Sequence, residues 1–147
     1  MRPFHILVLA AFLPLASAAQ EAGPPPLSIM AAADVVLADF LWLKRPVVVF
    51  ADSPNDPNFT HQMALLAADP AALDLRDVVV ITDTDPAART AIRQHLRPRG
   101  FSLVLIDKDG EVKLRKPLPW NVREITHTFD RFPLARQERL ERHPAGR

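Results

Sequence analysis

Residues 47–59 have the sequence VVVFADSPNDPNF, and this stretch decides the expected fold. It begins with an unbroken run of β-branched, aromatic and small apolar residues, which is typical of a strand that is covered on both faces. Asp56 and Pro57 then supply a helix N-cap and a favourable first helical residue. The stretch therefore predicts a buried strand that breaks into a short loop and enters a helix.

The rest of the chain repeats this alternation of strand and helix. We expect helices over residues 28–43, after Asp56, after Asp85 and after Asn121. A strand–helix–strand unit implies a right-handed parallel crossover, and the turn at residues 107–110 implies an antiparallel hairpin with solvated turn side chains. The predicted fold is an α/β sandwich with helices on both faces of a mixed sheet of about four strands, in the spatial order 78–82, 47–51, 101–106, 112–116.

This element order resembles the core of the thioredoxin fold, and two segments carry the resemblance. Residues 48–52 look like the strand that leads to the paired redox cysteines of that fold, and residues 100–111 look like the strand and hairpin that follow its cis-proline. The chain contains no cysteine, and Ser102 occupies the position of the cis-proline. The resemblance implies a three-layer thioredoxin-like sandwich that is not a thiol–disulfide oxidoreductase, because thiol exchange needs an attacking thiolate.

A narrower resemblance rests on residues spread over most of the chain. They are Trp42, Arg45-Pro46, Gln62, Arg76-Asp77, Lys108-Asp109-Gly110 with Lys113, Pro133, and Arg136-Gln137-Glu138. In their order these residues are similar to a bacterial domain-of-unknown-function family, number 4174, which is regarded as thioredoxin-like and has relatives in sushi-repeat-containing extracellular proteins. The sequence departs from the family pattern at Asp107, where a glycine is expected, and over residues 132–136. The resemblance implies a fold but no established activity.

The first residues predict export. Arg2 precedes an apolar run over residues 6–15, and small residues follow at positions 16–19, which is the layout of a secretory signal peptide. The apolar run is too short to span a membrane. We therefore expect a periplasmic or secreted protein that is cleaved near Ala18 or Ala19 and has no membrane span.

We divide the chain into four parts. A signal peptide over residues 1–19 and a Pro-rich linker over 20–27 precede a thioredoxin-like domain over 28–135, whose last helix is expected to end at Pro133, and a charged extension follows over 136–147. Removing 19 of the 147 residues leaves 128, which is enough for one hydrophobic core without disulfides. The 18 Lys and Arg nearly balance the 17 Asp and Glu, so we expect no nucleic-acid partner.

Polar residues follow two of the predicted strands at the same edge of the sheet. In open α/β sheets ligands bind at this carboxyl edge, and a helix N-terminus adds backbone donors. The candidate binding residues are Asp52, Ser53, Asn55, Asp56, Asn58, His61, Gln62 and Asp83. Turn and cap roles already account for the residue types of the loop at 52–58, and we expect Gln62 to hydrogen-bond the loop backbone.

Two classes of function are compatible with this edge. A binding or interaction module of the cell envelope would use it, without a cofactor, to hold a protein or small molecule that the sequence does not identify. The alternative is an enzyme or metal-binding protein in which the carboxylates of Asp52 and Asp83 act together with the imidazole of His61. Their spacing matches no metal-ligand motif, so we favour a non-catalytic binding module and expect no bound metal ion.

Protein recovered from a bacterial periplasm is expected to have an intact mass that lacks residues 1–18 or 1–19. The reason is the pattern of small residues that follows the apolar run. Intact-mass spectrometry of the soluble cell fractions checks this expectation. A full-length mass in the soluble cytoplasm would contradict it.

Overall fold

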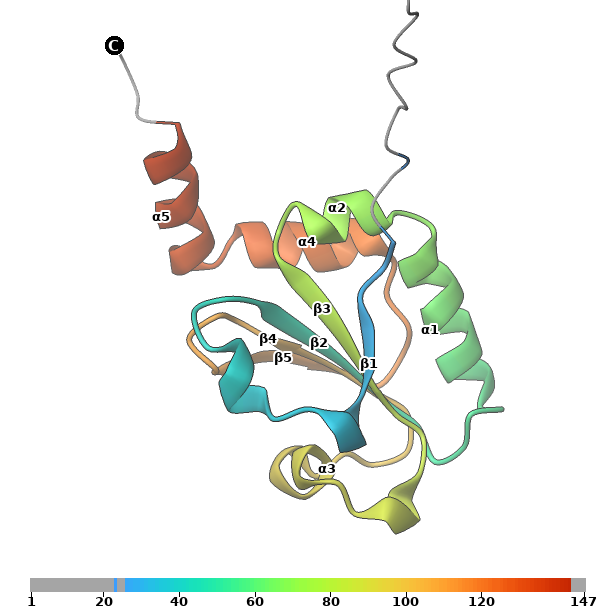
Figure 1. The fold of residues 1–147 in the computed structure, drawn as a ribbon. Coiled ribbons are helices and arrows are strands. Elements are labelled where there is room, and N and C mark those ends of the chain that lie inside the picture. The colour runs from blue at the N-terminus through green and yellow to red at the C-terminus, as the bar shows by residue number, and fades with distance from the viewer. Residues whose placement is uncertain (1–22, 24–25, 144–147) are drawn as a thin grey trace, which may run out of the picture.

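The computed structural model describes residue 23 and residues 26–143 (Figure 1). The signal peptide expected over residues 1–19 lies outside the described residues, as do most of the expected linker and residues 144–147. Within the described part of the chain, no helix has the length and hydrophobicity that a membrane crossing requires.

One mixed sheet forms the centre of the domain. Its strands are β1 (Ile29–Ala31), β2 (Arg45–Phe50), β3 (Val78–Asp83), β4 (Ser102–Ile106) and β5 (Val112–Lys116), in the spatial order β1-β3-β2-β4-β5. Strands β1 and β2 run parallel to β3, whereas β4 runs antiparallel to β2, and β5 antiparallel to β4. This arrangement confirms the α/β class and the predicted order of the four longer strands, and it adds β1 at the edge.

The prediction of a helix over residues 28–43 is wrong. These residues form β1 and then two short 3₁₀-helices, η1 (Ala32–Asp34) and η2 (Leu37–Phe40). The backbone here pairs with β3, and the amide of Val80 donates to the carbonyl of Ser28 over 2.9 Å. Pairing with a distant strand therefore outweighs the local helical pattern, as tertiary context often does.

The two faces of the sheet carry separate apolar cores, and β2 contributes to both. Val47 and Val49 lie in one core and Val48 and Phe50 in the other, because side chains alternate along a strand. Helices α1, α2 and α4 cover the first core, and α3 covers the second together with η1 and η2, so helices lie on both faces as predicted (Figure 1). The helices are α1 (Pro57–Ala67), α2 (Pro70–Asp74), α3 (Ala91–Leu96), α4 (Val122–Asp130) and α5 (Pro133–Arg142).

Two helix starts follow the predicted cap signals. The Oδ1 atom of Asp56 accepts hydrogen bonds from the amides of Asn58 (2.8 Å) and Phe59 (3.3 Å), so Asp56 caps α1. Asn121 and Glu124 form a capping box at the start of α4. Both devices satisfy amides that have no partner within the helix.

Two expected boundaries differ from the structure. The helix expected after Asp85 is divided, because Arg89 adopts a left-handed backbone (φ 47°) and α3 begins only after Thr90. Pro133 does not end the last helix but begins another, α5, since proline is well tolerated at the first helical position. Residues 136–142, which we expected in a charged extension, therefore belong to a helix.

Replacing Asp56 with alanine is expected to lower the free energy of unfolding by about 0.5–2 kcal/mol. The first turn of α1 loses its side-chain acceptor and a negative charge at the positive end of the helix dipole. Chemical denaturation measures the change, with Asp52→Ala at the exposed start of the same loop as the control. Equal stability of wild type and Asp56→Ala, at an unchanged denaturant slope, would show that this cap does not stabilise the helix.

Candidate functional site

The predicted loop lies after the carboxyl end of β2, where it was expected. Asp52 and Asn55 are exposed, whereas the other candidate side chains of the loop are partly buried. The amide of Asn55 donates to Oγ of Ser53 over 3.1 Å. The carboxylate of Asp56 accepts hydrogen bonds from two amides at the start of α1, including that of Asn58. The loop thus completes a turn and a helix cap, and a ligand contact at this position stays a prediction.

Asp83, at the carboxyl end of β3, is held by Arg93 of α3. Arg93 donates through Nε and Nη2 to Oδ1 of Asp83 (3.0 and 2.8 Å) and through Nη2 to the carbonyl of Ala51 (2.9 Å). Thr90 donates its hydroxyl to Oδ2 of Asp83 over 2.6 Å. Burial alone would raise the pKa of Asp83, but the hydrogen bonds from Arg93 and Thr90 outweigh it and hold the pKa below its ordinary value. Through Arg93, Asp83 therefore links the end of β3 to the end of β2.

The remaining candidates do not join Asp83. His61 is exposed on α1, and in the part of the chain that the structure describes no three His, Cys, Asp or Glu side chains are placed to hold a metal ion. Gln62 is fully buried, but it hydrogen-bonds the amide and carbonyl of Trp120 (2.9 and 2.8 Å) and not the loop. The structure therefore does not assemble Asp52, Asp83 and His61 into a metal site, and it corrects the partner expected for Gln62.

A group of buried charges that the sequence interpretation missed lies at the opposite edge of the sheet, where β2 begins and β4 ends. Arg45 is the first residue of β2 and is only 1% exposed. It donates through Nε to Asp107 (2.9 Å), through Nη1 to the carbonyl of Arg76 (3.1 Å) and through Nη2 to Glu138 (3.0 Å). One side chain thus joins the start of β2 to the end of β4, to the segment before β3 and to α5.

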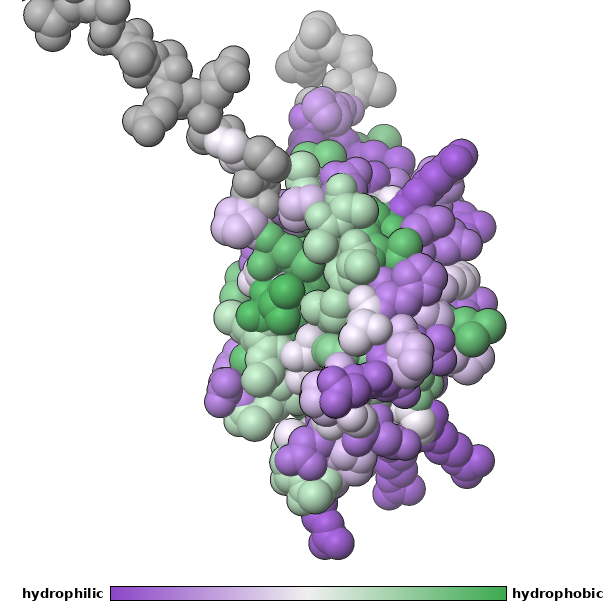
Figure 2. Space-filling model, turned by 90° about the vertical axis from the view of Figure 1, so that its right-hand side faces the viewer, coloured by the Kyte–Doolittle hydropathy of each residue, from purple (hydrophilic) through white to green (hydrophobic). Residues whose placement is uncertain are grey.

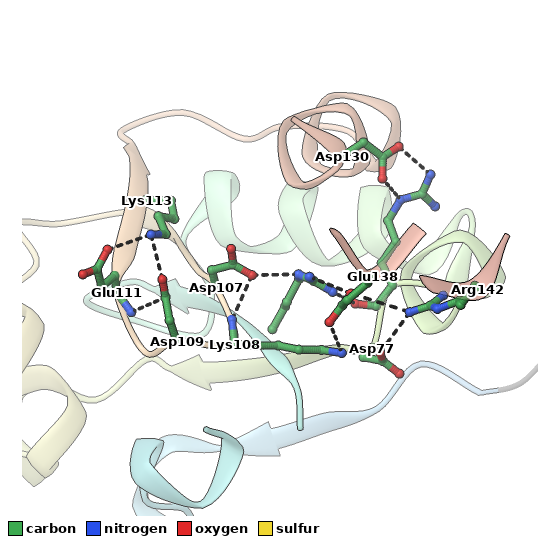
Figure 3. A network of polar contacts seen from close by, with 11 residues as sticks. Asp77, Asp107, Lys108, Asp109, Glu111, Lys113, Asp130, Glu138 and Arg142 are labelled. Carbon is green, nitrogen blue, oxygen red and sulfur yellow. Dashed lines mark hydrogen bonds and ion pairs between the residues drawn. The ribbon is translucent and has the colours of Figure 1, made fainter. Parts of the chain in front are cut away.

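Lys108 extends this group. Its Nζ atom lies 2.7 Å from Oδ2 of Asp77 and 2.8 Å from Oε1 of Glu138. Glu138 therefore lies between two cations, Lys108 and Arg45. Figure 3 shows Glu138 together with Lys108 and Asp77. Asp107 and Lys108 are 1% and 8% exposed, so the expectation of solvated side chains at the turn is wrong for its first two residues.

Close contact between opposite charges compensates for their burial in this group. Burial alone would raise the pKa of Glu138, but hydrogen bonds from Lys108 and Arg45 lower it below its ordinary value. Arg76 hydrogen-bonds both carboxylate oxygens of Asp130 at 2.9 Å and lowers the pKa of Asp130. Every buried side-chain nitrogen and oxygen in the described part of the chain has a hydrogen-bond partner. The buried charges of this group are therefore all satisfied by hydrogen bonds within the protein.

One signal in the sequence pointed to these residues. Arg45, Asp77, Lys108 and Glu138 are all among the residues that carry the resemblance to family 4174. No local pattern joins them, because the residues that Arg45 contacts lie 31, 62 and 93 positions away along the chain.

Exposed apolar side chains are concentrated in the residues that precede β2. Of the ten large apolar side chains that are exposed in the described part of the chain, six belong to residues 29–43, here called the N-terminal segment. They are Ile29, Met30, Val36, Leu41, Trp42 and Leu43, with exposed fractions between 40% and 65%. Figure 2 shows apolar surface gathered on one side of the molecule, below the residues drawn in grey.

A pocket of about 280 Å³ opens beside the N-terminal segment. Residues 35–38 and Leu41 form one wall, and Ile92 and His95 of α3 contribute to the other. At Gly110, which also lines the pocket, an added Cβ atom would come within 2.7 Å of Cδ2 of Leu41. The absence of a side chain at this position therefore lets Leu41 lie against the hairpin turn.

Comparison with known proteins identifies the family. The sequence profile of the family described as Domain of unknown function (DUF4174) matches residues 36–138. The chain belongs to this family. The Sushi repeat-containing protein SRPX2 of Bos taurus is 27% identical over an alignment that covers 86% of the DUF4174 chain and 32% of the bovine protein. The DUF4174 chain thus spans about a third of the length of this curated relative.

Solved structures show the fold of the DUF4174 chain. The reduced 2-Cys peroxiredoxin of Plasmodium vivax aligns with a TM-score of 0.53 at 17% identity, over 71% of this chain and 85% of its own. Desulfothioredoxin from Desulfovibrio vulgaris Hildenborough aligns with a TM-score of 0.53 at 20% identity, over 74% of this chain and 100% of its own. The DUF4174 chain therefore has the thioredoxin-like fold that its sequence predicts, without any cysteine.

The stability of the DUF4174 chain is expected to fall in acid. A carboxyl group with a lower pKa in the folded than in the unfolded chain stabilises the fold fully above its unfolded pKa, and this contribution disappears as the pH falls through the folded pKa. The carboxyl groups of Asp83, Asp130 and Glu138 have pKa values below their ordinary values of 3.8, 3.8 and 4.5. Urea denaturation should give a nearly constant free energy of unfolding above about pH 5.5 and a decline below about pH 4.5.

The variant Glu138→Gln isolates one part of this effect. It should be less stable than the wild type at neutral pH and should lose less stability in acid, because an amide does not titrate. Glu141→Gln, at an exposed position of the same helix, is the matched control. Parallel stability profiles for the wild type and Glu138→Gln would contradict the assignment of Glu138 to the buried group.

Proposed function

We propose that this chain is an exported, non-redox binding module of the cell envelope that holds a protein partner through the N-terminal segment. The observation that carries the proposal is the concentration of exposed apolar side chains in residues 29–43. Apolar patches on the surface of soluble proteins mark interaction sites, whereas single exposed apolar residues are ordinary, and Leu41, Trp42 and Leu43 expose three apolar side chains in succession. The export part of the proposal rests on the signal-peptide pattern of residues 1–19.

Trp42 supports this placement because it is exposed and held in an unfavourable conformation. Its side chain is 65% exposed and its φ is 63°, a backbone region that bulky residues rarely adopt. The amide of Trp42 donates to the carbonyl of Lys108 over 2.7 Å, which fixes the residue in place. Backbone strain of this kind is concentrated at functional sites, and tryptophan is enriched among residues that dominate binding energy.

The pocket beside the N-terminal segment gives the surface a recess. Its volume of about 280 Å³ suits a large apolar side chain, and Leu37, Leu41 and Ile92 supply apolar contacts. A partner that packs on Trp42 is expected to insert an apolar side chain here. Trp42 follows Leu41 of the pocket wall in the sequence, and an exposed aromatic together with a recess can provide the shape complementarity that a specific interface needs.

The carboxyl edge of the sheet gives less support for a ligand. Asp56 already satisfies the amides that begin α1, and Arg93 already satisfies the carboxylate of Asp83. A ligand at this edge would have to compete with these internal hydrogen bonds, whereas the side chains of the N-terminal segment are exposed.

A double variant, Trp42→Ser with Leu43→Ser, tests the proposal. Wild-type protein is used to retain a partner from periplasmic extract, and the purified partner is then titrated against each variant by calorimetry. We expect the double variant to bind about tenfold or more weakly, because it removes a central aromatic and its apolar neighbour. The control, Leu118→Ser with Leu140→Ser, removes two leucines outside the segment that are 62% and 66% exposed and should bind like the wild type.

Amide chemical shifts locate the contact independently. The proposal expects the partner to shift amides of residues 29–43 and of α3. Equal affinity of the wild type and the Trp42 and Leu43 double variant would contradict it. Shifts confined to residues 53–58 would instead place the contact at the loop that the sequence predicts.

A further inference from the structure

A second pocket lies between α5 and the body of the domain. Its volume is about 270 Å³. The charged residues that line it are Arg45, Arg76, Asp130, Glu138, Arg139 and Arg142. Four guanidinium groups therefore share this pocket with two carboxylates.

Both carboxylates already have cationic partners. Arg76 binds the two oxygens of Asp130 at 2.9 Å each. Glu138 accepts a hydrogen bond from Arg45 at 3.0 Å and contacts Lys108 at 2.8 Å. The hydrogen bonds to the two carboxylates of the pocket thus come from cations other than the two arginines of α5.

Arg139 and Arg142 are the two arginines of the pocket that donate no hydrogen bond to these carboxylates. Arg139 donates to the main-chain carbonyl of Asp130 over 2.6 Å. Arg142 lies 3.6 Å from Glu138 and 3.9 Å from Asp77, beyond the usual length of a hydrogen bond. In the residues that the structure describes, neither guanidinium is hydrogen-bonded to a carboxylate.

These two side chains are placed to act together. They are three residues apart on α5, so they project from the same side of the helix, and both line the pocket. Arg45 lines the pocket from the buried side, and its three hydrogen bonds use three of the five N–H donors of a guanidinium. Guanidinium groups therefore line the pocket from α5 and from β2.

We propose that this pocket binds a tetrahedral oxyanion, either as a free phosphate or sulfate ion or as the same group on a larger ligand. Guanidinium groups hold such oxyanions through paired hydrogen bonds whose geometry matches their planar fork. A partly water-excluding wall strengthens these hydrogen bonds relative to an open surface. The pocket shares no residue with the N-terminal segment, so its test is independent of the test of the proposed function.

Titration with sodium phosphate and with sodium sulfate tests the site. Each titration is followed by amide chemical shifts at an ionic strength held constant with sodium chloride. We expect saturable shifts in α5 and near Arg76, and we expect the two ions to compete for one site. A phosphate or sulfate ester of a small alcohol is the third probe, since it shows whether the group also binds when attached to a ligand. Shifts that sodium chloride reproduces would overturn the proposal.

Three variants distinguish binding in the pocket from non-specific attraction to positive charge. Arg139→Gln with Arg142→Gln should weaken binding about tenfold or more, because two charged hydrogen-bond donors are lost. Arg136→Gln removes an exposed arginine of the same helix that does not line the pocket, and it should leave the affinity unchanged. Arg139→Lys with Arg142→Lys keeps both charges and should restore part of the binding. A glutamine double variant that binds like the wild type would overturn the proposal, as would an Arg136→Gln variant that weakens binding as much as the glutamine double variant does.

Discussion

The buried guanidinium of Arg45 is the interaction on which the arrangement of this domain depends. It contacts the end of β4 through Asp107, the segment before β3 through the carbonyl of Arg76, and α5 through Glu138. A charge removed from water is tolerated only when its partners are in place, and removal of one partner of a buried ion pair costs about 3–5 kcal/mol. Segments that are far apart in the sequence must therefore meet correctly for this side chain to be accommodated. We interpret Arg45 as a residue that selects one geometry, because buried ion pairs often add little net stability.

Strand β2 is held by a guanidinium at each end. Arg45 lies at its amino end, and Arg93 of α3 binds Asp83 and the carbonyl of Ala51 at its carboxyl end. The Arg93 guanidinium also lies 5.3 Å from the centre of the Phe50 ring, within the range of a cation–π contact. The carboxylates of Asp56 and Asp83 at the carboxyl edge are thus committed to internal contacts, near the position where thioredoxin-like enzymes carry their chemistry. For this reason we place the proposed partner surface and the proposed oxyanion pocket elsewhere, along the N-terminal segment and beneath α5.

The features that local chemistry determines are predictable from this sequence. The apolar run of β2, the Asp56 cap and the capping box at Asn121 each depend on neighbours within a few residues. Strand β1 is not predictable in this way, because its pairing partner in β3 is about fifty residues away, as the pairing of Ile29 with Val80 shows. Pro133 is ambiguous because proline both ends and begins helices. At the candidate site the turn and cap residues follow from their types, whereas the capture of Asp83 by Arg93 and the burial of Arg45 depend on how separate elements pack.

The two ends of the domain are attached to the sheet by different forces. Strand β1 is held by main-chain hydrogen bonds to β3. Helix α5 has no buried residue, and ion pairs join it to the sheet edge, from Glu138 to Arg45 and Lys108 and from Arg142 to Asp77. Main-chain hydrogen bonds form whatever the side chains are, whereas these ion pairs need particular charged residues. Because the ion pairs of Glu138 are largely removed from solvent, dissolved salt screens them only weakly. One end of the domain is therefore attached in a way that most substitutions leave intact, and the other in a way that exchange of a single charged residue, Glu138, would disrupt.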